Sequence, residues 1–291
     1  MNFDEMKKVF SKFNIDKVKQ IVEEIENSLK QKVGPMVKLI TEDNKEFAEN
    51  FTYSKIIESI EKAKNEPWEL EKNSKSLRTD GIGNIAVVYN GSPEILLYLA
   101  VKALKTHNNI VFYEDTNIHK SSNYIIDLIN SILNKKDYKT TISIKKIKNF
   151  NEIYEDEKIF DSYICIGEIS KFNLLKNNIK KNIIYSAYGT VSLYLDDKNL
   201  KDTLLEMDEF VFKNNLALDL YKDKNVEDVI NKINKKGEDF CSVIFTKDAK
   251  KAYYFLENVN SQTVYINKNP FKNYNFFLDD KNLIKKKIII M

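Results

Sequence analysis

The chain has 291 residues, and 43% of them are hydrophobic, which suits one large domain or two modest ones with a sizeable core. Charged residues make up 31%, but the formal net charge is only +3 and the Lys-rich runs alternate with Glu and Asp. This balance argues against a dedicated nucleic-acid binder. The sequence opens on an acidic stretch without the features of a signal peptide, and no apolar stretch reaches the length of a membrane span. We therefore expect a cytoplasmic protein that does not engage a membrane.

Two cysteines, Cys165 and Cys241, each fall in an apolar run, and they are too few for a disulfide framework in a chain of this length. We interpret both as free, buried thiols in a reducing compartment. His107 and His119 are isolated, and no Cys/His cluster has the spacing of metal ligands, so we expect no metal site. Seven glycines are few for an enzyme whose backbone must approach a nucleotide phosphate.

The N-terminal part of the chain predicts helices. Apolar residues recur at helical spacing over residues 3–31, and Gly34-Pro35 breaks this run. A second helical stretch is expected from about Phe47 to Ala63. Residues 67–82 are polar without a clear period, and we expect them to form an irregular connection.

Short apolar runs rich in β-branched residues then alternate with helical patterns. Strands are predicted at residues 85–89, 110–113, 163–166 and 183–185 from their apolar runs, and at residues 141–144 from their alternation. Pro93 stands in the first turn of one intervening helix, and Ser121 or Ser122 is the predicted cap of the next, which reaches Leu133. The alternation predicts an α/β fold with a doubly wound parallel sheet preceded by N-terminal helices.

After Thr190 the pattern indicates a second, smaller α/β domain. Strands are predicted at residues 191–195, 243–246 and 263–267, and helices at 200–212, 226–233 and 248–259. The final apolar run, Ile288-Ile289-Ile290, is expected to form an edge strand that needs a pairing partner. We accordingly predict a dinucleotide-binding-like domain with its N-terminal helices over residues 1–190, a reduced catalytic-like domain over 191–270, and a tail over 271–291 that carries a candidate oligomerisation strand.

Four segments resemble one superfamily in their order and spacing. They are residues 82–95 with 103–112, residues 161–170, residues 182–191 with Asp196-Asp197, and residues 245–252 with 255–267. The first shows a strand, a Pro-led helix and an Ala-Leu-x-x-x-Asn turn. Together they resemble the aldehyde dehydrogenase superfamily, in a shortened and degenerate form. Gamma-glutamyl phosphate reductases and acylating aldehyde dehydrogenases are the most similar members, above all over the fourth segment.

The resemblance implies a definite chemistry. In these enzymes a Cys thiolate attacks the carbonyl carbon, amide groups stabilise the oxyanion, and NAD or NADP exchanges hydride with that carbon. In hydrolytic members a Glu also activates water. NAD or NADP is therefore the cofactor that the resemblance implies, provided that the binding residues are retained.

The residues that should carry this chemistry differ in this sequence. The family pattern Phe-x-Asn-x-Gly-Gln-x-Cys is matched best by residues 212–219, which puts Asp219 at the nucleophile position, and Ser186 stands at the position of the Glu. An aspartate is a far poorer nucleophile toward an aldehyde, and a serine alone is no general base. Cys241 could serve only as a relocated nucleophile, and a buried structural thiol is the favoured interpretation.

The resemblance places the cofactor beside Asn90, Ser92, Tyr113, Gly167 and Ser170. Asn90, Tyr113 and Gly167 also lie at the carboxyl ends of predicted strands, at the edge where a doubly wound sheet forms its ligand crevice. In many members of this superfamily, a Lys that follows the second strand binds the adenosine ribose of the cofactor. Tyr113-Glu114 stands there instead, and the Glu114 carboxylate would repel the extra phosphate of NADP.

Three hypotheses follow. The favoured one is an aldehyde dehydrogenase-like protein without the usual Cys-dependent catalysis, which serves a binding or structural role and pairs with itself or with an active relative. The alternative is an active NAD(P)H-dependent reductase of an acyl phosphate or thioester, with a rearranged site. The third is a doubly wound protein of unrelated function, which the fourth segment opposes.

Overall fold

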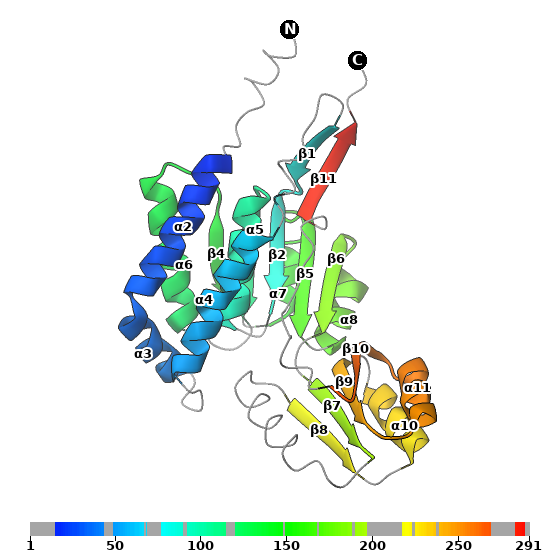
Figure 1. The fold of residues 1–291 in the computed structure, drawn as a ribbon. Helices are drawn as coiled ribbons and strands as arrows, with labels where there is room; N and C mark the ends of the chain where they lie inside the picture. Colours follow the sequence, from blue (N-terminus) through cyan, green and yellow to red (C-terminus); the bar gives the residue numbers. More distant parts are fainter. Residues whose placement is uncertain are drawn as a thin grey trace. The chain divides into compact units, whose positions relative to one another are not determined.

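A computed structural model describes the chain in two compact units (Figure 1). The described residues are 15–43, 49–66, 68, 77–89, 92–114, 120–147, 149–167, 169–187, 190–196, 217–222, 225–236, 239–268 and 283–288. Unit 1 comprises residues 1–164, 178–184 and 277–291, and unit 2 comprises residues 165–177 and 185–276. The roles predicted for residues 1–190, 191–270 and 271–291 stay predictions.

Unit 1 begins with three helices, α2 (Ile15–Gln31), α3 (Val33–Asp43) and α4 (Glu49–Asn65). The first and third confirm the predicted helices where the chain is described, and residues 1–14 lie outside the described part. The prediction missed α3. Gly34-Pro35 was expected to end helical structure, but a helix resumes there because proline is tolerated in the first turn of a helix.

A five-stranded sheet forms the centre of the fold, in the order β4-β3-β2-β5-β6. Its strands are β2 (Asn84–Val88), β3 (Asn109–Glu114), β4 (Ile142–Lys146), β5 (Ser162–Gly167) and β6 (Asn182–Ala187). Strands β2 and β3 pair in parallel, as do β3 and β4. Strand order departs from chain order around β2, as in a doubly wound sheet, and this confirms the predicted α/β architecture.

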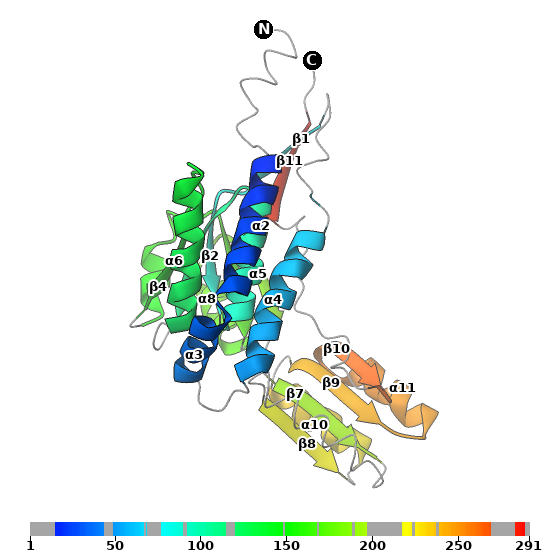
Figure 2. The same cartoon turned by 60° about the vertical axis from the view of Figure 1, so that its left-hand side comes forward.

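The helices that connect these strands are α5 (Pro93–Lys105), α6 (Lys120–Lys135), α7 (Asn151–Glu155) and α8 (Ile169–Asn178). Figures 1 and 2 show α2, α4, α5 and α6 side by side. Helix α5 is buried along most of its length, including two lysines, because other helices and the sheet surround it. Pro93 stands at its start, as predicted.

A two-stranded antiparallel ribbon joins distant parts of unit 1. Strand β1 (Leu77–Gly81) pairs with β11 (Ile284–Ile288), so that Leu77 lies opposite Ile288. The predicted irregular connection over residues 67–82 is therefore wrong at its end. A stretch with one apolar residue among five gives no strand signal, and its strand conformation depends on hydrogen bonds to a remote segment. The predicted final strand over 288–290 lies four residues earlier, and Ile289 and Ile290 fall outside the described residues.

Unit 2 contains a parallel sheet in the order β10-β9-β7-β8. Its strands are β7 (Thr190–Leu195), β8 (Ala217–Lys222), β9 (Asp239–Phe245) and β10 (Ser261–Ile266), and its further helices are α10 (Val226–Lys236) and α11 (Ala249–Asn258). Tyr194, Ile244 and Phe255 form the centre of an apolar core between this sheet and the two helices. The prediction missed β8, and the helix predicted at 200–212 lies outside the described residues.

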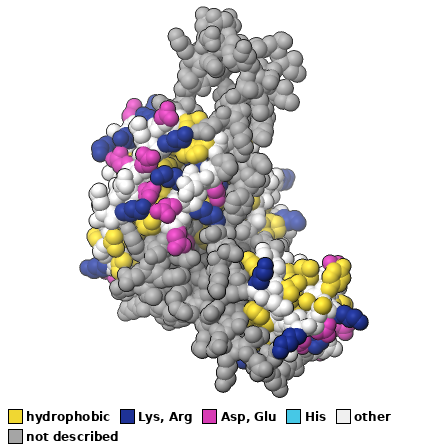
Figure 3. Space-filling model, in the orientation of Figure 1, with side chains coloured by type: hydrophobic (Ala, Val, Ile, Leu, Met, Phe, Trp, Pro, Cys, Tyr) yellow, Lys and Arg dark blue, Asp and Glu magenta, His cyan; other side chains and the backbone are white. Residues whose placement is uncertain are grey.

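Charged side chains of both signs are interspersed over the helices of unit 1 (Figure 3). Glu24 of α2, for example, lies 3.1 Å from the ammonium groups of both Lys135 and Lys136 at the end of α6. This mixture agrees with the balanced charge of the sequence. In the part of the chain that is described, no helix is long and apolar enough to cross a bilayer.

Candidate functional site

The carboxyl ends of β2 and β3 lie side by side, because the strands pair in parallel with Val88 opposite Tyr113. This edge is where a doubly wound sheet usually binds its ligand. Tyr89 follows β2 directly, and Glu114 is the last residue of β3. Both side chains are buried, at about 2% exposure. The edge therefore holds a carboxylate in the interior of the protein.

Glu114 is held by hydroxyl groups of its own chain. The Tyr89 hydroxyl donates a short hydrogen bond to the Glu114 carboxylate, and its oxygen also lies 3.5 Å from Oγ of Ser122 on α6. Burial raises the pKa of Tyr89 well above its usual value, and the charge of Glu114 adds to this effect. The phenol therefore remains a proton donor, and the carboxylate is bound internally.

The N-terminus of α6 is occupied by Asp43, the last residue of α3. One oxygen of Asp43 accepts a hydrogen bond from the backbone N–H of Lys120 at 2.7 Å, and the other accepts from the N–H and the hydroxyl of Ser121 at 2.7 and 2.5 Å. The predicted cap, Ser121 or Ser122, is wrong, because both lie inside the helix. A cap from another helix leaves no local sequence pattern. Asp43 neutralises the helix end where an anionic ligand group could otherwise bind.

Tyr113, predicted to contact the cofactor, is also bound within unit 1. Its hydroxyl donates to Asp156 at 2.8 Å, and Lys145 donates to the same carboxylate oxygen at 2.7 Å. Burial raises the pKa of Tyr113, with a further contribution from Asp156. The hydrogen bond from Lys145 is the main cause of a lowered pKa for Asp156. Tyr113 thus joins β3 to the turn after α7.

The other predicted cofactor residue of this edge, Ser92, is the residue at the N-cap of α5, and its side chain makes no capping hydrogen bond. Asn90 lies outside the described residues. The structure brings Tyr89, Glu114 and Ser122 together, a cluster that the sequence did not single out. The only sequence signal for it was Glu114 at the position of the family's Lys.

In unit 2, Gly167 ends β5 with φ at 137°, a backbone conformation that favours glycine. Its carbonyl oxygen accepts a hydrogen bond from the Tyr185 hydroxyl at 3.1 Å. The Tyr185 ring stacks on Phe172 of α8, with ring centroids 4.5 Å apart. Ser170, in the first turn of α8, is exposed. The Gly167 carbonyl is therefore bound by a side chain of the neighbouring strand β6, and Ser170 faces solvent.

The residues expected at the catalytic positions do not converge. Asp219 lies within β8, opposite Ser192 of β7, whereas Cys241 lies within β9, opposite Val191. Side chains of consecutive strand residues point to opposite faces of a sheet, so Asp219 and Cys241 project from opposite faces. Ser186 lies half-buried in β6, which belongs to the other sheet.

Both cysteines are free and buried, with 1% exposure each. Burial raises the pKa of the Cys165 thiol to about 12, so at neutral pH it carries almost no thiolate, the form that attacks carbonyl groups. No group of three or more His, Cys, Asp or Glu side chains within the described ranges is placed to hold a metal ion.

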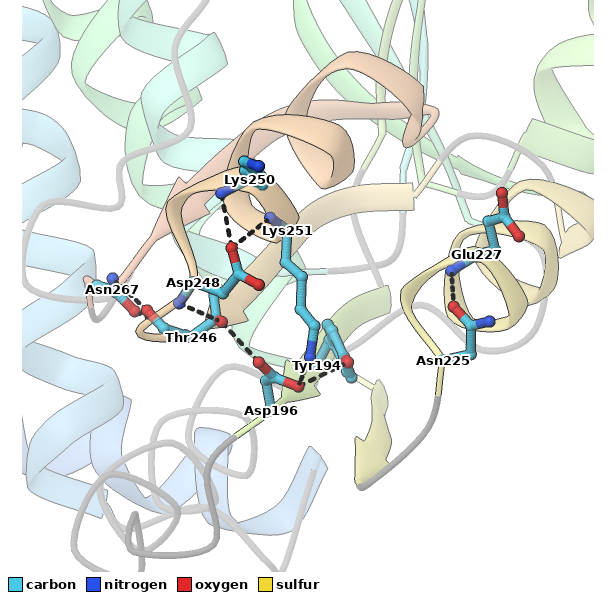
Figure 4. A network of polar contacts seen from close by, with 9 residues as sticks. All are labelled: Tyr194, Asp196, Asn225, Glu227, Thr246, Asp248, Lys250, Lys251 and Asn267. Atoms are coloured by element: carbon cyan, nitrogen blue, oxygen red, sulfur yellow. Dashed lines mark hydrogen bonds and ion pairs between the residues drawn. The ribbon is translucent and has the colours of Figure 1, made fainter.

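A polar network lies at the carboxyl ends of β7, β9 and β10 in unit 2 (Figure 4). Asp196 after β7 accepts hydrogen bonds from Thr246 at 2.7 Å and from Lys251 of α11 at 2.7 Å. Asp248 caps α11 by accepting from the backbone N–H groups of Lys250 and Lys251. The side chain of Asn267 accepts from the Thr246 N–H at 2.9 Å. The third and fourth resembling segments meet in this network, which ties three strand ends to one helix.

Replacing Asp196 with Asn is expected to destabilise unit 2 by about 1 kcal/mol at neutral pH, since the partner ammonium of Lys251 is partly exposed. Burial opposes ionisation of Asp196, but the hydrogen bonds from Lys251 and Thr246 outweigh it and lower its pKa below 3.8. The stabilisation is therefore complete above about pH 5 and is lost as the pH falls through the lowered pKa. Amide hydrogen exchange of β9 and α11 at several pH values measures it. A difference in hydrogen-exchange protection between wild type and variant that persists at pH 2 would contradict the stabilising role of the ionised Asp196 carboxylate.

No protein-family model matches the sequence, and no curated protein matches it. Solved structures match in fold. A probable aldehyde dehydrogenase from Listeria monocytogenes aligns at 10% identity and a TM-score of 0.71, spanning 99% of this chain and 94% of that one. An acetylating aldehyde dehydrogenase from Geobacillus thermoglucosidasius aligns at 11% identity and 0.70, spanning 98% and 93%.

A gamma-glutamyl phosphate reductase from Thermotoga maritima aligns at 14% identity and a TM-score of 0.55, spanning 90% of this chain and 85% of that one. With 291 residues this chain is shorter than these neighbours, which have about 450. Their identities lie far below those of close relatives, so the comparison concerns architecture. The fold of this chain is that of the aldehyde dehydrogenase superfamily.

Proposed function

We propose that this chain is an aldehyde dehydrogenase-like protein that does not use Cys-dependent catalysis and instead serves a binding or structural role. The observation that supports this proposal is that both cysteines are buried. The sequence contains two, Cys165 and Cys241, and both lie inside β-strands with 1% exposure. An enzyme that forms a thioester intermediate needs a thiolate that its substrate can reach.

The edge of β2 and β3 supports the same proposal with respect to a cofactor. Glu114 and Asp43 place two carboxylates at this edge and at the N-terminus of α6. An NAD or NADP pyrophosphate is anionic, and it would require hydrogen-bond donors that these carboxylates already occupy. The described residues of this edge therefore do not fit an anionic cofactor group.

A thiol titration tests the first part of the proposal. With the native protein at pH 8 and the disulfide reagent DTNB, we expect neither cysteine to react within the time in which a free small-molecule thiol reacts completely. In denaturant two thiols should react. The reason is that burial holds Cys165 protonated and shields both sulfur atoms. Rapid reaction of one native thiol, mapped to Cys241 by its loss in Cys241→Ser, would support the relocated nucleophile instead.

Titration with NADH and NADPH, followed by nucleotide fluorescence, tests the second part. We expect no saturable binding up to millimolar concentration. Glu114→Gln provides a matched variant, because it removes one charge and keeps the hydrogen-bonding shape. Saturable binding to the wild type would contradict the proposed loss of cofactor.

The alternative is an active NAD(P)H-dependent reductase of an acyl phosphate or thioester. Structural neighbours that include a gamma-glutamyl phosphate reductase and an acetylating aldehyde dehydrogenase favour this second candidate. Its test is acyl-dependent oxidation of NADPH by the wild type that disappears in Cys241→Ser.

The partner is proposed to be a second copy of the chain or an active relative. The β1–β11 ribbon contains two strands, and within the described ranges no third strand of the same chain joins it. Among the described residues, each strand therefore has one edge that pairs with no other strand. Sedimentation analysis should show an oligomer, and a monomer at micromolar concentration would refute pairing with a second copy.

A further inference from the structure

The β1–β11 ribbon (Figure 1) consists of two strands that differ in charge. Strand β11 carries three consecutive lysines at residues 285–287, whereas β1 carries one basic and one acidic residue, Arg78 and Asp80. Among the described residues, neither strand has a further strand along its outer edge. Such an edge is a template for strand addition by another chain, and lysines placed along it oppose that addition. The two outer edges are therefore not equivalent as docking surfaces.

The hydrogen bonds between the two strands define the outer edge of β1. The backbone N–H of Ile82 donates to the carbonyl oxygen of Leu283, the residue before β11, at 3.2 Å. Successive residues of a strand direct their backbone groups to opposite edges. Arg78 and Asp80 therefore share the orientation of Ile82 and direct their backbone groups to β11. Thr79 directs its N–H and C=O groups to the outer edge.

Strand β11 is a poor surface for a second copy of the chain. When two copies of one strand pair antiparallel about a twofold axis, one residue lies opposite its own copy, and the residues on either side lie opposite each other. A pairing centred on any residue from 285 to 287 therefore places one lysine directly opposite another. Like charges in directly opposite positions destabilise a sheet.

Strand β1 has one symmetric register that brings unlike charges together. A pairing centred on Thr79 places Arg78 opposite Asp80 of the partner subunit, and the reverse pair forms at the other end. A pairing centred on Arg78 or on Asp80 would instead oppose two like charges. The Thr79 register also fits the backbone, because the outward groups of Thr79 can exchange two hydrogen bonds with Thr79 of the partner subunit. Charge and hydrogen bonding thus select the same register.

The ribbon by itself has an excess of positive charge. Arg78 lies opposite Lys287, and Asp80 lies opposite Lys285. One cross-strand pair therefore joins two basic residues, and Asp80 supplies the single carboxylate of the two strands. A second copy would add a carboxylate opposite Arg78, on the edge away from Lys287. Pairing along β1 therefore offsets a repulsion that the separate chain contains.

We propose that two copies of this chain pair antiparallel along β1, in the register centred on Thr79, and form a four-stranded sheet in the order β11-β1-β1-β11. The inference rests on the proposed pairing with a second copy and adds its strand, its register and its charge pairs. Arg78 and Asp80 select the register, and the lysines of β11 keep the outer edges of the four-stranded sheet from further addition. The assembly therefore closes at two copies.

Charge reversal tests the register. Sedimentation velocity of the full-length chain measures the dissociation constant of the wild-type dimer. Arg78→Glu should raise this constant at least about tenfold, because it opposes two acidic residues at both ends of the pairing. The same change places an acidic residue opposite Lys287, so a weaker ribbon is not the cause. In the double variant Arg78→Glu with Asp80→Lys, unlike charges meet again, and the constant should return to within about threefold of the wild-type value.

Thr79→Pro tests the backbone contact. The N–H that it removes points to the outer edge, where strands tolerate proline, so the ribbon keeps its own hydrogen bonds. The variant should be monomeric and as folded as the wild type by far-UV circular dichroism. Lys286→Glu is the matched control, because it lies opposite Thr79 on the other strand and changes the charge as much as Arg78→Glu does. It should shift the dissociation constant by less than about threefold.

These measurements are independent of the proposed loss of Cys-dependent catalysis, which the thiol and nucleotide titrations test at any oligomeric state. A monomeric wild type at micromolar concentration would overturn pairing with a second copy. An oligomer whose dissociation constant is unchanged in both Arg78→Glu and Thr79→Pro would overturn pairing along β1.

Discussion

Replacing Glu66 with Gln is expected to destabilise unit 1 by about 3–5 kcal/mol, the range found when one partner of a buried ion pair is removed. Lys102, at 1% exposure, would keep its charge in the interior and lose its carboxylate partner. Gln is nearly isosteric with Glu and can still accept a hydrogen bond from the Tyr98 hydroxyl. The loss of stability therefore reports the removal of the negative charge alone. Urea unfolding followed by the fluorescence of Trp68, the only tryptophan, provides the measurement.

Two further variants serve as controls. Glu24→Gln breaks an ion pair with Lys135, whose side chain is 72% exposed, and should change stability by less than about 1 kcal/mol. Glu66→Gln combined with Lys102→Met should recover most of the lost stability, because the buried charge is removed with its partner. If the free energy of unfolding of Glu66→Gln lies within about 1 kcal/mol of the wild-type value, the interior ion pair does not stabilise the helix interface.

Gly83→Ala is the second substitution with a large expected effect, about 3 kcal/mol or more. Gly83 has a φ of 131°, which L-residues other than glycine rarely adopt. An added Cβ would lie 2.2 Å from Oδ2 of Asp161, the atom that accepts a hydrogen bond from the Asn84 N–H. The methyl group therefore strains the backbone and displaces a hydrogen-bonding partner of β2. Urea unfolding followed by Trp68 fluorescence measures the loss.

The combination with Asp161→Ala separates the two causes. Removing the carboxylate relieves the clash but leaves the backbone strain, so the double variant should be more stable than the sum of the two single effects by at least about 1 kcal/mol. Gly34→Ala is the matched control: an added Cβ there meets nothing within 4 Å and lies in the first turn of α3. It should be neutral or slightly stabilising. Equal effects at Gly83 and Gly34 would contradict this explanation.

The sequence predicted what depends on local pattern. The buried strands around Val87 and Ile164 were found because a short apolar run fits a strand covered on both faces. Helix α11 was found because its apolar residues recur at helical spacing, and the structure adds that Asp248, predicted as its first residue, is its N-cap. The same logic failed at β1, whose residues acquire strand structure from a partner far away in the chain.

The candidate site was predicted less well, for a related reason. The sequence shows which residue types are absent, so the lack of a Cys between Cys165 and Cys241 was certain. It does not show which side chains meet. Asp43 at the end of α3 caps α6, and Glu114 is held by Tyr89, and both contacts join separate elements. Buried lysines such as Lys102 likewise have the same residue type as exposed ones, and only packing distinguishes them.

The ribbon of β1 and β11 also affects the order in which the protein can form on the ribosome. Synthesis proceeds from the N-terminus, and domains that are continuous in sequence can fold while later parts are still being made. Unit 1 is not continuous, because it is formed by residues 1–164, 178–184 and 277–291. Strand β1 therefore cannot pair until residues 284–288 have been synthesised. Unit 2 is synthesised in that interval and can fold first. Until residues 284–288 have been synthesised, the backbone of β1 lacks its native partner, and in this period the nascent chain is exposed to strand exchange with a neighbouring copy.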